Sequence, residues 1–351
     1  MSAEYVDAVV VGGGQSGLAA AHAFMREGRS PVVLEASDEP VGSWPRYYDS
    51  LTLFSPARHS GLPGMPFDGD GDRYPRRDEV VEHLRRFANR LDADIRTGHR
   101  VEAVTRTGDG AFSVRLGGGR SLTTATVIAA TGGFGNPHRP GLPGLASFTG
   151  RLLHAGEYRN PEPFEGQRVV VVGAGNSAVQ IGAELAEHAD VTLATRRPVK
   201  LTRQRPLGRD LHWWLKVTGL DTAPVGRHLR TPPTQLVIDD GRYRSALAAG
   251  APDRRPLFTG ISGDHVTWAD GTSERVDAIV LATGYRPDLG YLGPLGVMSG
   301  DGHPRHREGV ATNVPGLGFV GLEWQRSLSS ASVRGVGRDA ARVARLLSRP
   351  Q

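Results

Sequence analysis

Two copies of one local pattern constrain this chain more than any other feature. Each copy is an apolar strand, a tight glycine turn, an alanine-rich helix and a second apolar strand. The first reads "YVDAVVVGGGQSGLAAAHAFMREG" and "SPVVLEAS", and the second reads "QRVVVVGAGNSAVQIGAELAEHA" and "DVTLATRR". Continuous apolar strands that alternate with helices are typical of a parallel sheet. The duplication therefore predicts an α/β chain with two Rossmann-like dinucleotide-binding domains.

The two copies also end alike, and this sets the expected domain order. Each is followed by strands with glycine turns, typical of a small antiparallel meander, and then by an apolar strand ending in "AATGG" (129–133) or "LATGY" (281–285). At 351 residues the chain suits two domains. We expect one at 1–147 and 284–351, with the second inserted at 148–283. The region 201–256 fits neither template and predicts an irregular insertion, with a short aromatic helix near Trp213 and Trp214.

The first glycine loop has the spacing of a dinucleotide site. It contains Gly12, Gly14, Gln15, Ser16 and Gly17. The first glycine permits a sharp turn, the second lets the backbone approach a pyrophosphate, and the third allows close helix–strand packing. The helix N-terminus then favours the anion. Glu35 ends the next apolar strand, where a carboxylate binds ribose hydroxyls.

The second glycine loop repeats this arrangement with a different ribose end. It contains Gly173, Gly175, Asn176, Ser177 and Ala178. The strand after it ends in Thr195, Arg196 and Arg197, without a carboxylate. A carboxylate would repel a 2′-phosphate, whereas arginine binds one bidentately, so this site is predicted to prefer NADPH over NADH. The alternative is that these arginines are solvated surface charge in an arginine-rich chain.

Two sites with different ribose ends predict two different cofactors. FAD and NADPH are the economical pair, with hydride passing from the nicotinamide to the flavin. The chain has no cysteine, which excludes a disulfide framework, a thiolate metal site and a Cys-x-x-Cys redox pair. The electrons of an oxidoreductase built on this chain must therefore stay on a cofactor.

Five motifs carry a resemblance to a known family: "GGGQSG" (12–17), "VGSW" (41–44), "FTGRLLHAGEY" (148–158), "GAGNSA" (173–178) and "LATGY" (281–285). With them the chain resembles the single-component FAD- and NADPH-dependent monooxygenases. These include flavin-containing monooxygenases, plant auxin-forming monooxygenases and bacterial relatives, some from metal- or arsenic-resistance operons. The stretch 148–158 matches the family's Phe-x-Gly-x-x-x-His-x-x-x-Tyr/Phe fingerprint at every fixed position. Baeyer–Villiger relatives end it in Trp, so Tyr158 favours heteroatom or simple oxygenation.

The resemblance implies a flavin-dependent monooxygenase. NADPH would reduce FAD, O2 would form a C4a-(hydro)peroxyflavin, and one oxygen would pass to a small molecule at sulfur, nitrogen, arsenic or a carbonyl. Two alternatives stay open. One is an NADPH-dependent flavoprotein reductase that passes electrons to a carrier or quinone. The other is a non-catalytic redox sensor that binds FAD and NADP(H).

The resemblance also implies roles for residues outside the glycine loops. They are Ser43 and Trp44 beside the flavin, Val101 at the adenine, Thr131, Gly132, Thr283 and Gly284 at the domain crossings, and Trp324 and Gln325 near the isoalloxazine. The last helix, expected from about Ser330, would direct its N-terminus at the flavin. Many family members have an asparagine near the flavin where this chain has Phe54 and Ser55, which bears on how long the peroxide survives.

No side chain is assigned as catalytic. His154 is open to two interpretations, a catalytic base or a structural histidine between the domains. Flavin peroxide chemistry needs no essential imidazole, so we favour the structural one, in which 148–158 is a strap into the second domain. His303-x-x-His306 lies in a loop rich in Pro and Arg without carboxylates, so no metal site is expected.

Charge and hydropathy limit the partners. The formal net charge is +5, but the arginines are scattered without interleaved aromatic residues, which argues against nucleic acid. No apolar run approaches the ~20 residues of a membrane span. No charged and apolar leader precedes the first strand. We expect a cytoplasmic monomer or homodimer that acts on a small molecule and O2, without membrane or nucleic-acid partners.

Overall fold

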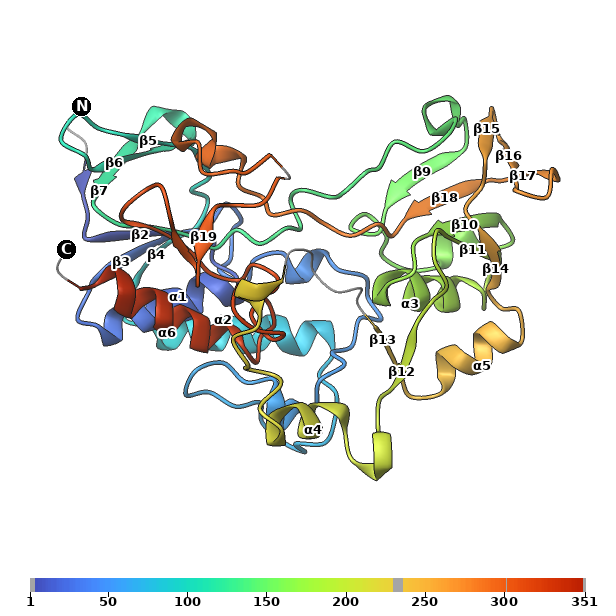
Figure 1. The fold of residues 1–351 in the computed structure, drawn as a ribbon, viewed down its shortest axis with the longest axis horizontal. Helices are drawn as coiled ribbons and strands as arrows, with labels where there is room; N and C mark the ends of the chain where they lie inside the picture. The colour runs from blue at the N-terminus through green and yellow to red at the C-terminus, as the bar shows by residue number, and fades with distance from the viewer. Residues whose placement is uncertain (1–3, 230–235, 301, 350–351) are drawn as a thin grey trace.

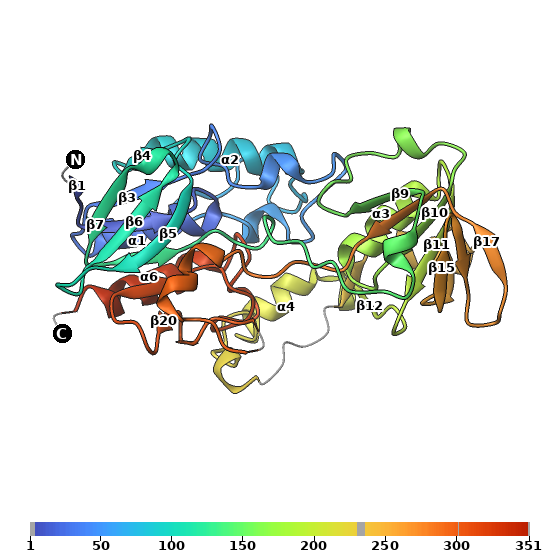
Figure 2. The same cartoon turned by 90° about the horizontal axis from the view of Figure 1, so that it is seen from above.

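The computed structural model describes residues 4–229, 236–300 and 302–349. These residues form two bodies joined by extended segments (Figure 1). The first body contains the early and the late parts of the chain, and the second contains a central stretch, coloured green to orange. Figure 2 shows from above that the two bodies lie side by side along the long axis. The predicted α/β class with two Rossmann-like units and small meanders is confirmed.

The first body is built on a seven-stranded sheet in the order β19-β20-β21-β8-β2-β3-β4. The strands are β2 (Ala8–Val11), β3 (Pro31–Leu34), β4 (Asp94–Arg96), β8 (Val127–Ala129), β19 (His306–Arg307), β20 (Val310–Ala311) and β21 (Leu317–Phe319). The strands from β21 to β4 pair in parallel, whereas β20 is antiparallel to both its neighbours. Every residue of β2 and β3 is buried, as expected of continuous apolar strands between two layers.

Helices α1 (Gln15–Arg26) and α6 (Val336–Leu347) pack together on one face of this sheet. Four alanines of α1 are buried, and their small side chains let the helix approach the strands closely. In α6 the buried residues Val336, Ala340 and Val343 recur at helical spacing and form one apolar stripe. Helix α2 (Arg77–Arg90) buries its own stripe in a separate cluster with Leu18.

The start of the last helix differs from the sequence prediction. We expected it near Ser330, but α6 begins at Val336, so that expectation is wrong. The hydroxyl of Ser330 accepts hydrogen bonds from the main-chain N–H groups of Arg326 (3.1 Å) and Ser327 (2.9 Å). These bonds hold a turn, because a serine hydroxyl offers the backbone an alternative partner to the helical carbonyl.

The other face of the seven-stranded sheet carries the first meander. It is a four-stranded sheet in the order β1-β7-β6-β5, with β1 (Glu4–Tyr5), β5 (Val101–Arg106), β6 (Phe112–Leu116) and β7 (Ser121–Thr124). Strands β5, β6 and β7 pair antiparallel. Phe112, Val114 and Leu116 alternate along β6 and bury against Val9 and Val32 of the large sheet, so one face of the meander belongs to the core.

The second body has a five-stranded parallel sheet in the order β14-β11-β10-β18-β9. The strands are β9 (Arg151–His154), β10 (Arg168–Val172), β11 (Asp190–Thr195), β14 (Asp253–Pro256) and β18 (Ala278–Leu281). Helix α3 (Asn176–Leu185) packs on it. The second meander is β15 (Gly260–Ser262), β16 (His265–Thr267) and β17 (Ser273–Arg275).

The region 201–256 is more regular than the sequence indicated. It contains β12 (Leu201–Arg203), α4 (Leu211–Val217), β13 (Val237–Asp239), α5 (Arg242–Ala248) and β14. The expected aromatic helix near Trp213 is α4. Strand β14 joins the five-stranded sheet beside β11, so the end of this region belongs to the second body. Its middle reaches back to the first body, where Arg334 forms an ion pair with Asp221 at 2.7 Å.

Two extended segments, 131–138 and 283–288, carry the chain between the bodies and pair with each other. The main-chain N–H of His138 donates to the Gly284 carbonyl at 2.9 Å. The N–H of Arg286 donates to Asn136 at 2.9 Å, and that of Asp288 donates to Gly132 at 2.8 Å. We call this pair of segments the crossing ribbon. Because its strands hold each other, the orientation of the second body depends on a ribbon rather than on single loops.

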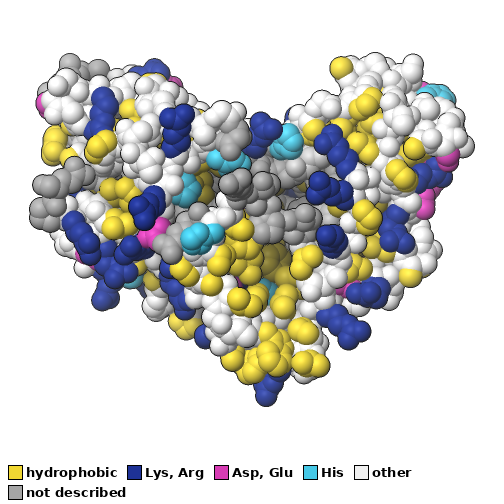
Figure 3. All heavy atoms as spheres, in the orientation of Figure 1, with side chains coloured by type: hydrophobic (Ala, Val, Ile, Leu, Met, Phe, Trp, Pro, Cys, Tyr) yellow, Lys and Arg dark blue, Asp and Glu magenta, His cyan; other side chains and the backbone are white. Residues whose placement is uncertain are grey.

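The distribution of charged side chains on the surface is relevant to whether the protein binds nucleic acid. On the face in Figure 3, lysine and arginine side chains are spread over both bodies rather than gathered in one stripe. No helix within the described ranges combines the length and apolarity that crossing a membrane requires. These residues also include no group of three or more His, Cys, Asp or Glu arranged to hold a metal ion.

Candidate functional site

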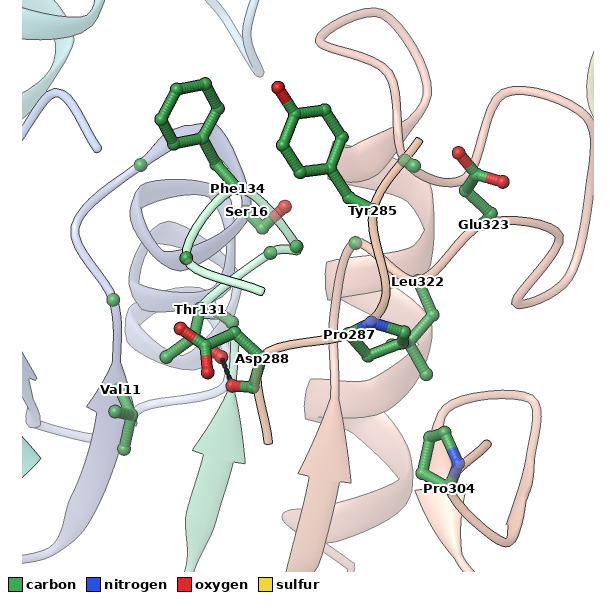
Figure 4. Close-up of a pocket in the computed structure, with 18 of the residues that line it drawn as sticks. Val11, Ser16, Thr131, Phe134, Tyr285, Pro287, Asp288, Pro304, Leu322 and Glu323 are labelled. Carbon is green, nitrogen blue, oxygen red and sulfur yellow. Dashed lines mark hydrogen bonds between the residues drawn. The ribbon is translucent and has the colours of Figure 1, made fainter. Parts of the chain in front are cut away.

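A cavity of about 1640 Å³ opens at the carboxyl ends of β2, β3 and β8 in the first body. Parallel sheets usually bind ligands at this edge. Sequence-predicted residues that line the cavity are Gly12, Gly14, Gln15, Ser16, Glu35, Ser43, Val101, Thr131, Gly132, Trp324 and Gln325. Segments far apart in the sequence thus meet around one space. Figure 4 shows Val11, Ser16 and Thr131 on its floor, with Leu322 and Glu323 on another wall.

The first glycine loop needs its glycines for contact with other backbone. Gly12 has a φ of +107°, and a Cβ there would lie 2.7 Å from the Ala130 carbonyl oxygen. A Cβ on Gly17 would lie 1.7 Å from the Gly12 carbonyl oxygen. Gly17 therefore lies behind the loop, where it lets α1 pack against β2, and it does not line the cavity. The N-terminus of α1 lies at the cavity, because its N-cap residue Gly14 and the first helical residues Gln15 and Ser16 line it.

Glu35 is 7% exposed and lies at the cavity wall directly after β3. Its Oε2 accepts a hydrogen bond of 2.6 Å from the main-chain N–H of Gly13. Its Oε1 accepts from the N–H of Ser37 (2.8 Å) and from the Ser37 hydroxyl (2.7 Å). A carboxylate has about four lone-pair sites. Three internal bonds therefore fix its orientation and leave it able to accept from a further hydroxyl.

Two predicted residues contact each other rather than standing alone. The indole N–H of Trp44 donates to Oε1 of Gln15 at 2.8 Å, which ties the 3-10 helix η1 (Trp44–Arg46) to the start of α1. Trp44 supports the cavity wall without being one of the residues that line it. Its ring begins a row of aromatic contacts: Trp44–Tyr47 (5.5 Å), Tyr47–Phe134 (4.8 Å), Phe134–Tyr285 (5.4 Å) and Tyr285–His154 (4.9 Å between ring centroids).

The far wall comes from the chain after β21. Trp324 has a φ of +55°, the left-handed region that non-glycine residues seldom adopt. The Oε1 of Gln325 accepts from the Leu322 N–H at 3.3 Å, whereas its Nε2 is buried without a hydrogen-bond partner among the described residues. That nitrogen abuts Gly309, where a Cβ would lie 2.3 Å away. The Gln325 amide nitrogen is therefore packed against Gly309 instead of being open to the cavity.

Residues 226–229 bring the second half of the chain to the same cavity. Gly226, His228 and Leu229 line it, and a Cβ on Gly226 would lie 2.0 Å from the Trp324 carbonyl oxygen. The Gly226 N–H also donates to the Arg326 carbonyl at 2.9 Å. We call residues 226–229 the cavity flap. No sequence motif marks it, because its position depends on Asp221 and on backbone contacts.

The second glycine loop lies in the second body, outside this cavity. Gly173 has a φ of +147°, and a Cβ there would lie 2.3 Å from the Ala282 carbonyl oxygen, whereas the site of a Gly175 Cβ is open. Ala178 is buried against the sheet. Ser177 begins the first turn of α3 with Asn176, whose Oδ1 accepts from the Ile238 N–H at 3.2 Å. Asn176 thus holds β13 beside the loop.

The three residues predicted to bind the 2′-phosphate of NADPH are consecutive in sequence at the end of β11. Thr195 is the last residue of the strand, and Arg196 and Arg197 are exposed directly after it. Burial lowers the pKa of His138 first, and the charges of Arg286 and Arg196 lower it further. Arg196 therefore lies on the side of the second body that faces the crossing ribbon.

His154 is 1% exposed and has both ring nitrogens engaged. Nδ1 accepts from the Gly156 N–H at 3.1 Å, so Nε2 carries the proton and donates to the Gly284 carbonyl at 3.1 Å. Burial lowers the pKa of this imidazole. The stretch expected to be a strap contains β9, a strand of the five-stranded sheet, and Tyr158 donates to Glu184 at 2.8 Å. Thr283 donates to the His138 carbonyl, so Thr283 and Gly284 lie in the ribbon and not in the cavity.

Comparisons with known proteins agree with this geometry. Residues 9–216 match the family described as pyridine nucleotide-disulphide oxidoreductase. The chain is 31% identical over 342 residues to an uncharacterized CzcO-like oxidoreductase of Geobacillus kaustophilus, covering 95% of this chain and 96% of that one. It is 32% identical to the rice (Oryza sativa subsp. japonica) indole-3-pyruvate monooxygenase YUCCA1, covering 80% and 77%. The solved flavin-containing monooxygenase of Stenotrophomonas maltophilia superposes with a TM-score of 0.86 at 32% identity, covering 98% of each chain.

Proposed function

Because the chain belongs to the pyridine nucleotide-disulphide oxidoreductase family, as a flavin monooxygenase-like member, we propose an oxygen-transfer reaction for it. As an FAD- and NADPH-dependent monooxygenase, it would transfer one oxygen of O2 to a small molecule, at sulfur, nitrogen, arsenic or a carbonyl carbon. The large cavity is the observation that carries this proposal. Ligand pockets commonly measure about 300–1,000 Å³. A cavity of about 1640 Å³ has room for a second molecule beside a dinucleotide.

The residues of the cavity fit FAD. Gly12 would make the turn at the pyrophosphate, while the backbone of Gly14 and the N-terminus of α1 would bind it where no side chain intervenes. Glu35 would accept the ribose hydroxyls, and the Val101 main chain would hold the adenine. Ser43, Thr131, Gly132, Trp324 and Gln325 would form the remaining wall, with Trp44 holding Gln15 in place. When bound, FAD accepts a hydride from NADPH and activates O2.

The second body would hold NADPH. Gly173 and Gly175 let a pyrophosphate approach the N-terminus of α3, and Asn176, Ser177 and Ala178 form its first turn. Thr195, Arg196 and Arg197 would bind the 2′-phosphate, because exposed guanidinium groups can take it bidentately. We assign 148–283 to NADPH binding, and 1–147 with 284–351 to FAD binding, with Thr283 and Gly284 at the junction.

His154 would position rather than catalyse. Its two hydrogen bonds hold Gly156 to Gly284, so its ring fixes where the crossing ribbon enters the second body. The pKa of the imidazole is lowered, which keeps it neutral and in this one tautomer. A neutral ring with both nitrogens bonded to backbone has no free position for a substrate proton.

The oxygenated molecule would lie in the part of the cavity lined jointly by the cavity flap and the wall at Trp324, which pack against each other. These segments come from both halves of the chain, and Leu229, Leu322 and Trp324 give the space apolar sides. Such sides exclude water from the reacting atoms. Glu323 and His228 add polar groups on the same wall.

The proposal is tested by following the flavin absorbance of the purified holoenzyme. Anaerobic NADPH should bleach it, and O2 without substrate should reoxidise it slowly, with little peroxide released. Reoxidation by a quinone that is much faster than by O2 would favour a reductase. If NADPH fails to bleach the flavin, both enzyme functions are excluded and a redox sensor is left.

A further inference from the structure

Two polar residues that line the cavity have no part in the roles assigned above. Asp288 lies in the second segment of the crossing ribbon, and Tyr291 begins the next turn of chain in the 3-10 helix η8 (Gly290–Leu295). Neither belongs to a glycine loop or to a motif of the sequence. Figure 4 shows the Asp288 side chain beside Thr131, with Val11 at the end of the neighbouring strand β2.

The backbone of Asp288 is fixed on both sides. Its N–H donates to the Gly132 carbonyl at 2.8 Å, and its carbonyl accepts from the Thr131 hydroxyl at 2.6 Å. Both partners belong to the first segment of the ribbon. The side chain lies against Gly135, where an added Cβ would be 2.2 Å from Oδ2 of Asp288. The main chain thus places the carboxyl group at the cavity wall, next to Gly135.

That carboxyl group has no hydrogen bond or ion pair with any residue that the structure describes. Burial raises its pKa, while the charges of Arg100 and Arg46 act against that shift. Arg100 lies toward the end of the cavity where Val101 and Glu35 meet, and Arg46 lies at the end formed by η1. Asp288 therefore stands between the two ends. A carboxyl group left half-buried without a partner is costly unless a ligand supplies one.

The Tyr291 hydroxyl adds a second unsatisfied group. Its oxygen is buried within the cavity wall and has no hydrogen-bond partner in the described part of the chain, so a ligand in the cavity does not contact it directly. Burial raises the pKa of this hydroxyl, the nearby Thr131 hydroxyl lowers it, and Asp288 raises it further. The hydroxyl stays protonated at neutral pH and can both donate and accept.

We infer that Asp288 forms a binding subsite for the hydroxyl-bearing sugar-alcohol linker of FAD, an inference that rests on FAD binding in this cavity. A carboxylate accepts from hydroxyls but repels a phosphate, which argues against the pyrophosphate as its partner. Glu35, which follows β3, is already assigned to the adenosine end. Asp288 lies beside the end of β8, and β2 runs between β3 and β8. The linker is the hydroxyl-rich part of FAD that remains.

This subsite ties cofactor binding to the arrangement of the two bodies. The same residue that would bind the linker holds the two segments of the crossing ribbon together through Gly132 and Thr131. Bound FAD would therefore reduce the freedom of the ribbon at the point where it leaves the first body.

The test is FAD binding by the apoprotein, measured from flavin fluorescence. Asp288→Ala should raise the Kd about 10- to 100-fold, as for the loss of a charged hydrogen bond, whereas Tyr291→Phe, whose hydroxyl is buried within the wall, should change it less than about twofold. Asp92→Asn, an exposed acid of the same body, should change nothing. Asp288→Asn keeps the shape and should weaken binding less than Asp288→Ala, while circular dichroism checks that each variant folds.

Two results would overturn the inference. Tighter binding by Asp288→Asn would mean that the carboxylate faces a phosphate. Unchanged binding by Asp288→Ala, alongside weakened binding by Glu35→Gln, would mean that FAD occupies the cavity without using this subsite. If the wild-type protein bound no FAD at all, the proposed function itself would fail, so the two failures are distinguishable.

Discussion

The imidazole of His154 stands edge-on to the ring of Tyr285, with the centroids 4.9 Å apart and 74° between the planes. His154 belongs to β9 of the second body, whereas Tyr285 lies in the crossing ribbon and lines the cavity of the first. The pair thus links the two bodies at the point where nicotinamide and flavin would face each other in the proposed function. Tyr285 continues the aromatic row to Phe134 and Tyr47, so a disturbance at His154 reaches the cavity mouth.

Replacing His154 tests this link. His154→Ala leaves the Gly156 N–H without its partner and removes one of the two donors to the Gly284 carbonyl, at a cost of about 1–3 kcal/mol in stability. We expect the KM for NADPH to rise and the share of NADPH that yields oxygenated product to fall, while oxygen transfer persists. His265→Ala, an exposed histidine of the second meander, is the control. Normal flavin reduction with complete loss of oxygen transfer would instead make His154 catalytic.

Glu35 should govern FAD retention. Glu35→Gln replaces one carboxylate oxygen by an NH2 group, which would face either the Gly13 N–H or the Ser37 donors. Loss of a charge-assisted bond costs about 1.5–3 kcal/mol, so the Kd for FAD should rise about 10- to 100-fold. Dialysis followed by flavin quantification measures this. Glu27→Gln, at the exposed end of α1, should retain the cofactor, and equal loss in both variants would contradict the role of Glu35.

The arginines after β11 should set the preference between NADPH and NADH. Arg196→Glu combined with Arg197→Glu places negative charge where the 2′-phosphate is expected, so kcat/KM for NADPH should fall far more than that for NADH. Steady-state rates with both nucleotides give the ratio. Arg254→Glu, exposed on the neighbouring strand β14, should leave it unchanged. An equal loss for both nucleotides would refute the 2′-phosphate assignment.

The cavity flap should act on the oxygenated substrate rather than on FAD. A Cβ on Gly226 would overlap the Trp324 carbonyl, and overpacking of this kind costs about 1–3 kcal/mol. Gly226→Ala should therefore move the flap and change the substrate KM, with FAD affinity altered less than about twofold. Gly260→Ala, where a Cβ meets open space, is the matched control. Loss of FAD from Gly226→Ala would place the flap at the flavin instead.

Stability should fall below neutral pH because of a buried histidine in α2. The ring of His83 stacks on Phe67 at 3.9 Å, and burial, then the Arg86 charge, lowers the pKa of His83 to about 4. The His83 imidazole takes up a proton near pH 6.5 in the unfolded chain but only near pH 4 in the folded chain. The free energy of unfolding is therefore highest above pH 6.5, and the contribution of His83 is lost as the pH falls from 6.5 to 4. The loss is on the order of 3 kcal/mol. Urea melts of wild type and His83→Leu at pH 7 and pH 5 measure it, and an equal fall in both would exclude His83.

Much of the fold could be predicted because it depends on local pattern. The βαβ units around Gly12 and Gly173 need continuous apolar strands and glycine turns, and both can be recognised directly in the amino-acid sequence. The start of α6 was missed because the Ser330 hydroxyl accepts from the N–H groups of Arg326 and Ser327 and so holds a local turn instead of capping the helix. Strand β9 was missed because it is a half-exposed sheet edge with polar residues.

The residues of the cavity also divide into those that the sequence predicts and those that it does not. Glu35 was found because its distance from the glycine loop is fixed by one strand and one helix. Asp288, Tyr291 and the cavity flap were not found, because they reach the cavity through the crossing ribbon and through the Asp221–Arg334 ion pair, contacts between residues far apart in sequence. A resemblance supplied Trp44, whose bond to Gln15 no local pattern predicts.

The central claim is that the oxygen of O2 ends in an organic product at the expense of NADPH. The most direct measurement supplies the holoenzyme with NADPH and oxygen-18 gas and a panel of thioethers, amines and ketones, followed by mass spectrometry. We expect one labelled oxygen in the product, the other in water, and one NADPH consumed for each product formed. Recovery of all the consumed oxygen as hydrogen peroxide with every compound, together with faster turnover on a quinone, would contradict a monooxygenase.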